Sequence, residues 1–188
     1  MIMSQRVWQI SLAACVIGVL TLGIGQTRAA QIMGPAKDVP ELQVLNSYVG
    51  TWEVVMATSD APNAVIGKGK SSTKWILDGR FLEQSGTMLM TEGNTSIKVT
   101  TLMTFDVGTK TYRSWTFSSN GQATESEAKW DPATQTMTST SCPNPKSHKV
   151  VTVANFAEAG IEKWKMTITD ESGQLVRNLI GKNTRQKE

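Results

Sequence analysis

The stretch that decides the fold is IEKWKMTIT, residues 161–169. Its apolar residues Trp164, Met166 and Ile168 alternate with two lysines and a threonine. Because successive side chains of a β-strand point to opposite faces of the sheet, this alternation predicts a strand with one buried and one wet face. Residues 123–131 repeat the pattern, with charged side chains on one face and apolar side chains on the other.

Strands of this kind occupy most of the chain after a short helix, which we predict at residues 40–47 with Pro40 in its first turn. Runs of high β-propensity alternate there with turn chemistry, as in the turn-rich segment 58–63. Asp78-Gly79 and Asn120-Gly121 indicate tight turns, because their residues tolerate positive φ. The predicted strands are residues 48–56, 65–77, 80–90, 97–106, 111–118, 123–131, 135–141, 147–156, 161–170 and 174–181.

The connections between these strands decide the topology. No long helical pattern intervenes, which excludes parallel βαβ crossovers. Short turns produce an antiparallel meander, and closing about ten strands into a barrel removes both exposed edges. We therefore predict an all-β fold, a single up-and-down antiparallel barrel of about ten strands with a short N-terminal helix. The barrel domain is expected at residues 40–182, after a flexible leader at 31–39 and before a polar C-terminal tail at 183–188.

Residues 1–30 have the organisation of a secretory signal peptide. One arginine precedes the apolar stretch 7–24, and small residues end the segment. We expect cleavage after Ala29 or Ala30 and a mature protein in the periplasm or outside the cell. An uncleaved membrane anchor is one alternative, because the apolar stretch is about long enough to approach a span. A lipoprotein anchored through Cys15 is a minor alternative, because very few apolar residues precede this cysteine.

The charge of the expected mature chain is close to neutral. The full chain has 19 Lys and Arg against 16 Asp and Glu, a formal charge of +3, and two of the arginines lie in the first 30 residues. Because no basic surplus remains, nucleic acid is not an expected partner. Hydrophobic residues make up 39% of the chain, which suits a packed core. No membrane span is expected after cleavage, and the sequence does not indicate an oligomeric state.

Residues for catalysis or metal binding are scarce. Cys142 is the only cysteine after the signal and His148 the only histidine, so a tetrahedral zinc site and an internal disulfide are not expected. A Cys–His nucleophile would also need an orienting third group and a pocket. Haem held by His148 is a minor alternative. We therefore predict no catalytic residue, no metal and no cofactor.

Four blocks of the sequence are similar to a known family. They are LNSYVGTWE (residues 45–53), SSTKWILDGRFLE (71–83), FDVGTKTYRSW (105–115) and KWDPATQTMT (129–138). In this order and spacing they resemble the bacterial domain-of-unknown-function 1579 family over residues 41–182. That family is similar to lipocalins and other calycins in architecture, so the resemblance implies a calycin-like barrel. It implies no activity, because the family has no established one.

The motif residues have structural explanations. In lipocalin-like barrels, the tryptophan that resembles Trp52 closes one end of the barrel and often stacks under a cationic side chain. Arg80 and Arg177 are the candidates for this cation. Gly50 allows a tight start of the first strand. The predicted structural residues are Gly50, Trp52, Trp75, Gly79, Arg80 and Arg177.

Apolar and adaptable side chains recur on strands with a spacing that suits a single interior. Such a lining fits a lipid, a quinone, a pigment or another small apolar molecule, although each residue is also explained as plain core. Binding or carriage of such a ligand is the leading hypothesis. The predicted ligand-binding residues are Met88, Met90, Met103, Phe105, Trp115, Phe117, Trp164 and Met166.

Two other functions remain open on the sequence. One is an enzyme that acts on a small hydrophobic substrate inside the barrel, which would need a buried polar side chain. The candidates for that side chain are Arg80, Arg113, Tyr112 and Glu83. The other is a structural or interaction module of the envelope, with a filled barrel and an apolar outer patch.

Overall fold

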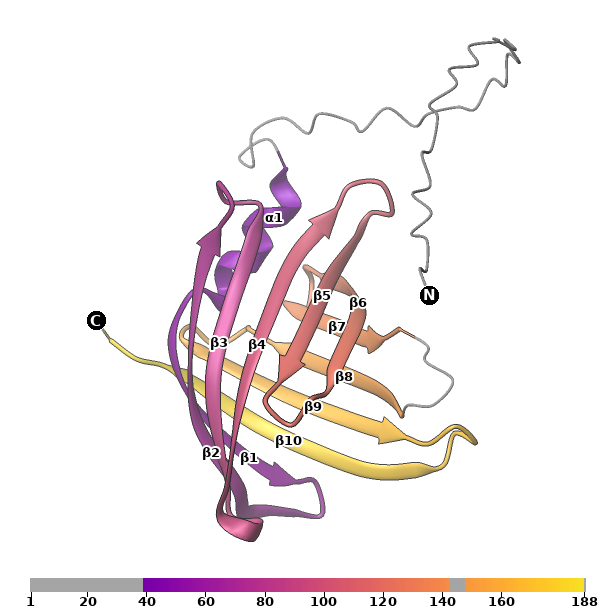
Figure 1. Ribbon diagram of the computed structural model, residues 1–188. Coiled ribbons are helices and arrows are strands. Elements are labelled where there is room, and N and C mark those ends of the chain that lie inside the picture. Colours follow the sequence, from indigo (N-terminus) through magenta and orange to yellow (C-terminus); the bar gives the residue numbers. More distant parts are fainter. Residues whose placement is uncertain (1–38, 143–147, 188) are drawn as a thin grey trace, which may run out of the picture. The chain divides into compact units, whose positions relative to one another are not determined.

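The computed structural model describes residues 39–142 and 148–187. Within these residues the protein is an all-β barrel of ten antiparallel strands, preceded by a short helical segment (Figure 1). The predicted fold class is therefore confirmed. The elements are α1 (Pro40–Val44), η2 (Leu45–Tyr48), β1 (Gly50–Thr58), β2 (Ala61–Ile76), β3 (Phe81–Met90), η3 (Glu92–Asn94), β4 (Thr95–Asp106), β5 (Thr111–Ser118), β6 (Ala123–Asp131), β7 (Thr136–Ser141), β8 (Lys149–Asn155), β9 (Ile161–Thr169) and β10 (Leu175–Arg185).

Some of the sequence-based predictions fall on parts of the chain outside the described residues. These parts include the expected signal peptide at residues 1–30 with Cys15, and nearly all of the expected leader at 31–39. Residues 143–147, a stretch with two prolines after Cys142, also lie outside. In the described part of the chain, no helix is both long enough and apolar enough to cross a membrane.

The strands follow one another around the barrel in chain order. Each strand pairs with its neighbours in the sequence, and β1 closes the sheet by pairing with β10. All of these pairings are antiparallel. Closure satisfies the backbone hydrogen bonds of the first and last strands, which would otherwise be exposed edges. The up-and-down meander predicted from the short turns is confirmed.

The last strand is longer than the sequence indicates. β10 runs to Arg185, so the prediction of a polar tail from residue 183 is wrong for its first three residues. The reason is closure of the barrel, because β10 must extend far enough for Arg185 to pair with Trp52 at the start of β1. Asn183 is only 8% exposed. Because its side chain is polar, its residue type does not predict this burial.

The second strand begins earlier than its composition indicates. β2 starts at Ala61, inside the segment 58–63 that is rich in turn-forming residues, and only two residues form the turn. The register between β1 and β2 shifts twice around Ala57. Such irregularities absorb extra residues and allow Pro62 to stand near the end of a strand.

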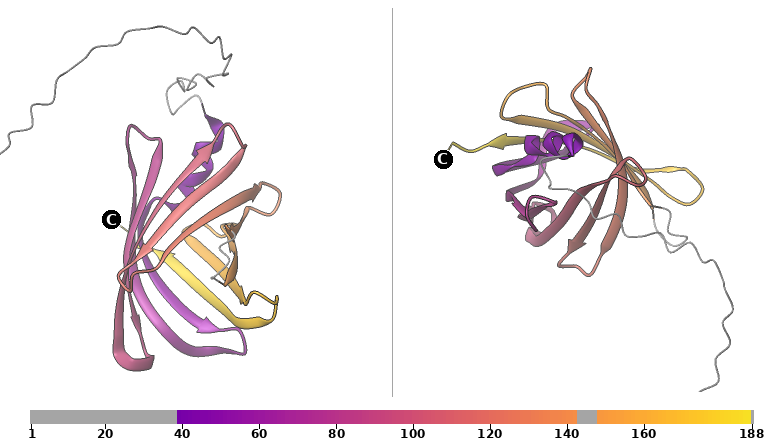
Figure 2. Two further views of the ribbon diagram at one scale, coloured as in Figure 1. Left: turned by 45° about the vertical axis from the view of Figure 1, so that its right-hand side comes forward. Right: turned by 90° about the horizontal axis from the view of Figure 1, so that it is seen from above.

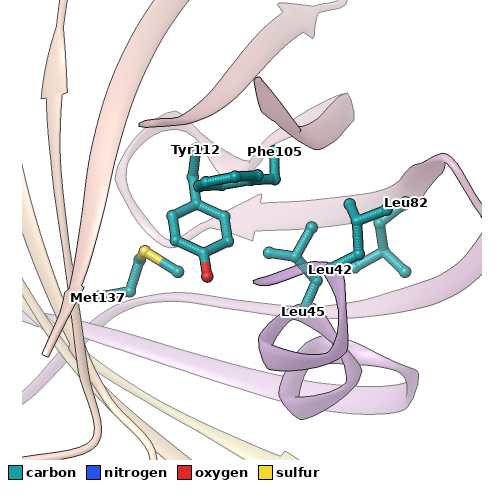
Figure 3. Close-up of a cluster of buried hydrophobic side chains, with 6 residues drawn as sticks. All are labelled: Leu42, Leu45, Leu82, Phe105, Tyr112 and Met137. Carbon is teal, nitrogen blue, oxygen red and sulfur yellow. The ribbon is translucent and has the colours of Figure 1, made fainter. Parts of the chain in front are cut away.

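The helical segment lies at one end of the barrel (Figure 2) and supplies two of its most deeply buried side chains. Leu42 and Leu45 are each 1% exposed, and their spacing of three places both on one face. The hydroxyl of Tyr112 donates a hydrogen bond to the carbonyl of Glu41 at 3.0 Å, which ties the helix to the barrel wall. The helix-end core consists of Leu42, Leu45, Leu82, Phe105, Tyr112 and Met137 (Figure 3).

Candidate functional site

The pairing registers fix which side chains point into the barrel. Trp52 and Met56 are buried on β1, and Val54 between them shares their face. Opposite Val54 stands Asn183 of β10, and opposite Asn183 stands Glu162 of β9. Because residues two apart share a face, these registers define the inner surface strand by strand around the barrel.

The inner surface borders a cavity of about 340 Å³ that is partly open to solvent. Tyr48, at the end of the helical segment, belongs to its wall, so the cavity reaches the end of the barrel where this segment lies. The apolar part of the wall is formed by Val54, Met56, Met88, Val99, Trp164 and Met166. The polar part includes Tyr48, Ser71, Gln84, Thr152, Glu162 and Asn183.

Three glycines lie on the inner face of β2 and β3, and one of them, Gly86, belongs to the cavity wall. Gly67, Gly69 and Gly86 stand on the inner face, where each leaves out a side chain. A Cβ atom at Gly67 would lie 3.1 Å from Cε of Met56 and 3.3 Å from Sδ of Met88. The cavity wall therefore includes the backbone at Gly86 and the flexible side chains of Met56 and Met88.

Three side chains of the cavity wall form a hydrogen-bonded network. Nε1 of Trp164 donates to Oδ1 of Asn183 at 3.0 Å, and Nδ2 of Asn183 donates to Oε2 of Glu162 at 2.6 Å. Glu162 is 7% exposed. Its burial raises the pKa of Glu162 to about 7, against the lowering effect of the hydrogen bond from Asn183. Burial also raises the pKa of Tyr48, and the charge on Glu162 raises it further.

Gly181 makes room for the indole ring of Trp164. The two residues are partners in the pairing of β9 with β10. A Cβ atom at Gly181 would overlap the six-membered part of the Trp164 ring. Only glycine at this position lets the ring lie over the backbone of β10 and reach Asn183.

The structure brings three of the predicted ligand-binding residues to the cavity wall. These are Met88, Trp164 and Met166. Met90 also faces inward and stands opposite Gly67. Met103 and Phe105 face inward as well, but Phe105 belongs to the helix-end core and Met103 packs against that core, so both are placed beside the helix.

Two of the predicted ligand-binding residues lie on the outer face. The prediction that Trp115 and Phe117 face the interior is wrong, because the pairing of Tyr112 with Phe105 puts Ser114 and its even-numbered neighbours inside. Phe117 is 50% exposed. The guanidinium carbon of Arg113 lies 5.5 Å from the ring centre of Trp115 on that outer face. After Tyr112, the inner face of β5 carries small serine and threonine side chains and the outer face carries the large apolar ones. Hydrophobic patterning predicts the opposite orientation.

Trp52 stacks under a cation that differs from both predicted ones. The guanidinium carbon of Arg185 lies 4.7 Å from the ring centre of Trp52, and Nη2 of Arg185 donates to the carbonyl of Ser47 at 2.8 Å. The prediction of Arg80 or Arg177 is therefore wrong. It failed because the last strand was expected to end before Arg185, which is the register partner of Trp52.

The other predicted structural residues lie near the helical segment or in a turn. Gly50 has a φ of +120° at the start of β1, and Gly79 has a φ of +77° in the turn between β2 and β3. Arg80 follows Gly79 in that turn. Nε1 of Trp75 donates to Oδ1 of Asn46 at 2.8 Å, which links β2 to the helical segment.

A family model described as a protein of unknown function (DUF1579) matches residues 37–185. This chain belongs to the DUF1579 family. The match covers the helical segment and the whole barrel, so the resemblance that the sequence motifs indicated is confirmed. Among curated proteins, no sequence matches this DUF1579 chain significantly.

Two solved structures are similar to this DUF1579 chain in fold. Rv2717c from M. tuberculosis is 11% identical, with a TM-score of 0.59 over 82% of this chain and 99% of that one. The S-type phycobiliprotein lyase CPES from Guillardia theta is 12% identical, with a TM-score of 0.56 over 78% of this chain and 92% of that one. At such identities the similarity shows the fold alone, and it confirms a calycin-like barrel.

The four polar residues considered for catalysis do not belong to the cavity wall of the DUF1579 barrel. Arg113 points outward and forms an ion pair with Glu125. Glu83 also points outward, with a lysine nitrogen 3.5 Å from its carboxylate. Tyr112 packs in the helix-end core, and Arg80 lies in the turn between β2 and β3. These residues therefore supply no catalytic group to the cavity.

Two residues of the site, Glu162 and Asn183, are missing from the set predicted from the sequence. The alternation in residues 161–169 predicts that Glu162 faces inward, because a residue two positions before Trp164 lies on the same face of the strand. A carboxylate that begins the apolar face of a strand is unusual and can be recognised from the sequence. Asn183 is missed because the last predicted strand ends too early.

Among the described residues, Cys142 and His148 are not part of a metal-binding group. Cys142 is a free thiol that directly follows β7, and burial raises its pKa, which disfavours the nucleophilic thiolate. Within residues 39–142 and 148–187, no group of three or more His, Cys, Asp or Glu side chains is arranged to hold a metal ion.

Proposed function

We propose that this DUF1579 protein binds or carries a small, mostly apolar molecule inside its barrel. The observation that carries the proposal is the cavity of about 340 Å³ among methionine, valine and tryptophan side chains. Ligand pockets commonly have volumes of about 300–1,000 Å³ and apolar walls with a few polar groups. The cavity fits this description, with Glu162 and Asn183 as its buried polar groups.

The distribution of side chains favours binding over a filled barrel that acts through its outer surface. The helix-end core packs only the part of the interior beside the helical segment. Beyond it, the interior holds the cavity, whose wall includes Gly86, an inner position without a side chain. Methionines around such a space can adjust to the shape of a ligand.

We also propose that the protein works in the periplasm or outside the cell, with no nucleic acid as a partner and no membrane span in its mature form. The support is the signal-peptide organisation of residues 1–30 and the nearly neutral charge of the rest. The intact mass of the chain recovered from the exported fraction tests this. A mass equal to that of a chain cleaved after Ala29 or Ala30 supports export. A full-length chain found in the cytoplasm contradicts it.

Two neighbouring valines allow a matched test of ligand binding. Val54 lines the cavity, whereas Val55 points outward and is 39% exposed. Val54→Trp fills part of the cavity, and Val55→Trp adds the same atoms to the outer face. With an uncharged apolar dye such as phenylnaphthylamine, we expect Val54→Trp to weaken binding about tenfold or more. Val55→Trp should leave the affinity within about twofold.

A second pair protects the test against a variant that does not fold. Met88 lines the cavity and the next residue, Leu89, is 48% exposed on the outer face. Met88→Trp should weaken dye binding and Leu89→Trp should not. Equal dye binding by inner and outer variants that both fold would show that the dye does not enter the barrel, and it would contradict the proposal.

A further inference from the structure

The cavity contains one buried charged group. Lys70 also borders the cavity, but its side chain is 76% exposed and its Nζ lies 4.0 Å from a carboxylate oxygen of Glu53 on the outside. Glu162 is 7% exposed and has Tyr48 and Asn183 as neighbours on the wall. A ligand in the cavity therefore meets a single carboxyl group among mostly apolar atoms.

The hydrogen-bonded network determines which oxygen of this carboxyl group is already occupied. An indole N–H can only donate, so Trp164 must face the amide oxygen of Asn183. The amide nitrogen of Asn183 is thereby turned toward Glu162, where Oε2 accepts its hydrogen. In the described part of the chain, this is the only hydrogen bond found to Glu162. Its other oxygen is left to accept a hydrogen from a group inside the cavity.

Protein cations near this wall are directed elsewhere. Arg185, which shares the inner face of β10 with Asn183, stacks on Trp52 and donates to the carbonyl of Ser47. The lysines at positions 163 and 165 lie on the outer face of β9. Among the described residues, no Lys, Arg or His forms an ion pair with Glu162. An ionised carboxylate that is buried without a cation is costly, and a ligand with a positive charge would offset that cost.

We propose that the ligand is an amphiphilic amine, with its protonated amino group on Glu162 and its apolar part among the methionines of the cavity. This inference rests on the proposed function and gives the chemical class of the ligand. An ammonium group donates up to three hydrogens, and the free oxygen of Glu162 accepts one of them. Ser71 also belongs to the cavity wall, and its hydroxyl oxygen is buried without a hydrogen-bond partner.

The charge on Glu162 also disfavours the commonest alternative ligands. A fatty acid would bring a second carboxylate next to the first, and like charges in a poorly hydrated site repel each other. A long-chain alcohol can donate one hydrogen to Glu162 but carries no charge. The order of affinity expected for chains of equal length is therefore amine, then alcohol, then carboxylic acid.

Three octyl compounds test this order. Octylamine, octanol and octanoic acid compete with phenylnaphthylamine for the full chain at about pH 8, where the amine is protonated and Glu162 is ionised. We expect octylamine to bind about tenfold or more tightly than octanol, and octanoic acid to bind most weakly. In Glu162→Gln, which keeps the shape of the side chain but removes its charge, the advantage of octylamine should fall below about threefold.

The control variant is Glu53→Gln, which removes an exposed carboxylate from the outer face of β1 and should leave the preference for octylamine unchanged. Denaturation of each variant verifies that it is folded. If all three compounds bind without a preference for octylamine, or if the preference survives in Glu162→Gln, the amine inference is wrong while the proposed function stands. If none of them binds and the dye does not bind, both fail.

Discussion

At the helix end of the barrel, Leu42, Leu45 and Leu82 are at most 1% exposed, whereas Met56 and Met88 border a cavity of about 340 Å³ in the same interior. The first region is packed mainly with branched aliphatic and aromatic side chains, together with Met137. The second is bordered by methionines, which adapt to irregular shapes, and by Gly86, which has no side chain. The contrast suggests that the helix end stabilises the fold and that the cavity is available for a ligand.

The polar groups of the two regions are also used differently. In the helix-end core, the hydroxyl of Tyr112 is bonded to the carbonyl of Glu41 and joins two structural elements. In the cavity, the one hydrogen bond found to Glu162 among the described residues joins Oε2 to Asn183. A buried polar group with spare hydrogen-bonding capacity lowers stability, so its presence in the cavity is better explained by recognition of a ligand.

The largest expected effect distinguishes the two regions by their contribution to stability. Leu82→Ala removes a side chain that is 0% exposed, and the lost packing should cost about 2–5 kcal/mol. Met88→Ala enlarges a cavity that already exists, so it should cost less than half as much. Urea unfolding of both variants measures the difference. Equal losses would mean that the cavity region is packed as tightly as the core.

The next effect is the pH dependence that Glu162 gives to stability. Its pKa is about 7 in the folded protein against about 4.5 for an ordinary glutamate, so the folded state binds the proton more tightly. Stability should therefore fall as pH rises from about 4.5 to about 7, by at most about 3 kcal/mol, and this component should then level off. Unfolding of the protein and of Glu162→Gln from about pH 5 to about pH 8 isolates this component.

The expected result is a fall of stability in the protein that is absent or much smaller in Glu162→Gln. Gln has no proton to lose in this range and keeps the hydrogen-bonding shape of the side chain. Parallel profiles for the two proteins would show that Glu162 is better solvated than its exposure of 7% indicates.

A smaller effect concerns the close contact between Trp164 and the backbone of β10. Gly181→Ala places a methyl group against the indole ring, and displacement of the ring should cost about 1–3 kcal/mol. The double variant Gly181→Ala, Trp164→Leu should lose less than the sum of the two single variants, because the smaller side chain leaves room for the methyl group. Additive losses in urea unfolding would contradict the contact.

The smallest effect separates the observed partner of Trp52 from one of the predicted partners. Arg185→Ala removes the stacking on Trp52 and the hydrogen bond to Ser47, at an expected cost of about 1–2 kcal/mol. Arg177→Ala, on the exposed part of β10, should change stability by less than about 0.5 kcal/mol. A larger loss from Arg177→Ala in thermal unfolding would support the sequence-based assignment instead.

The sequence predicts the barrel well because alternation and turn residues are local signals. The stretch around Trp164 and the Asp78-Gly79 turn both agree with the structure. It predicts the cavity wall less well, because inside and outside depend on register. On β5 the apolar Trp115 and Phe117 lie outside, because Tyr112 pairs with the inward-facing Phe105 and residues two apart share a face.

The part of the site that sequence patterns miss is polar and depends on closure of the barrel. Asn183 is buried only because β10 extends to pair with the start of β1. Its hydrogen bond to Glu162 joins β10 to β9, and the alternation within either strand alone does not predict this contact. The polar character of Asn183 alone assigns it to solvent, whereas the pairing register places it in the interior.

Native mass spectrometry of the mature protein from the exported fraction, combined with organic extraction, tests the central claim most directly. The account predicts an apolar molecule bound near one to one, which Val54→Trp retains less well than Val55→Trp. A protein that carries no such molecule, and that takes up neither phenylnaphthylamine nor an octyl compound when these are added, would contradict the account.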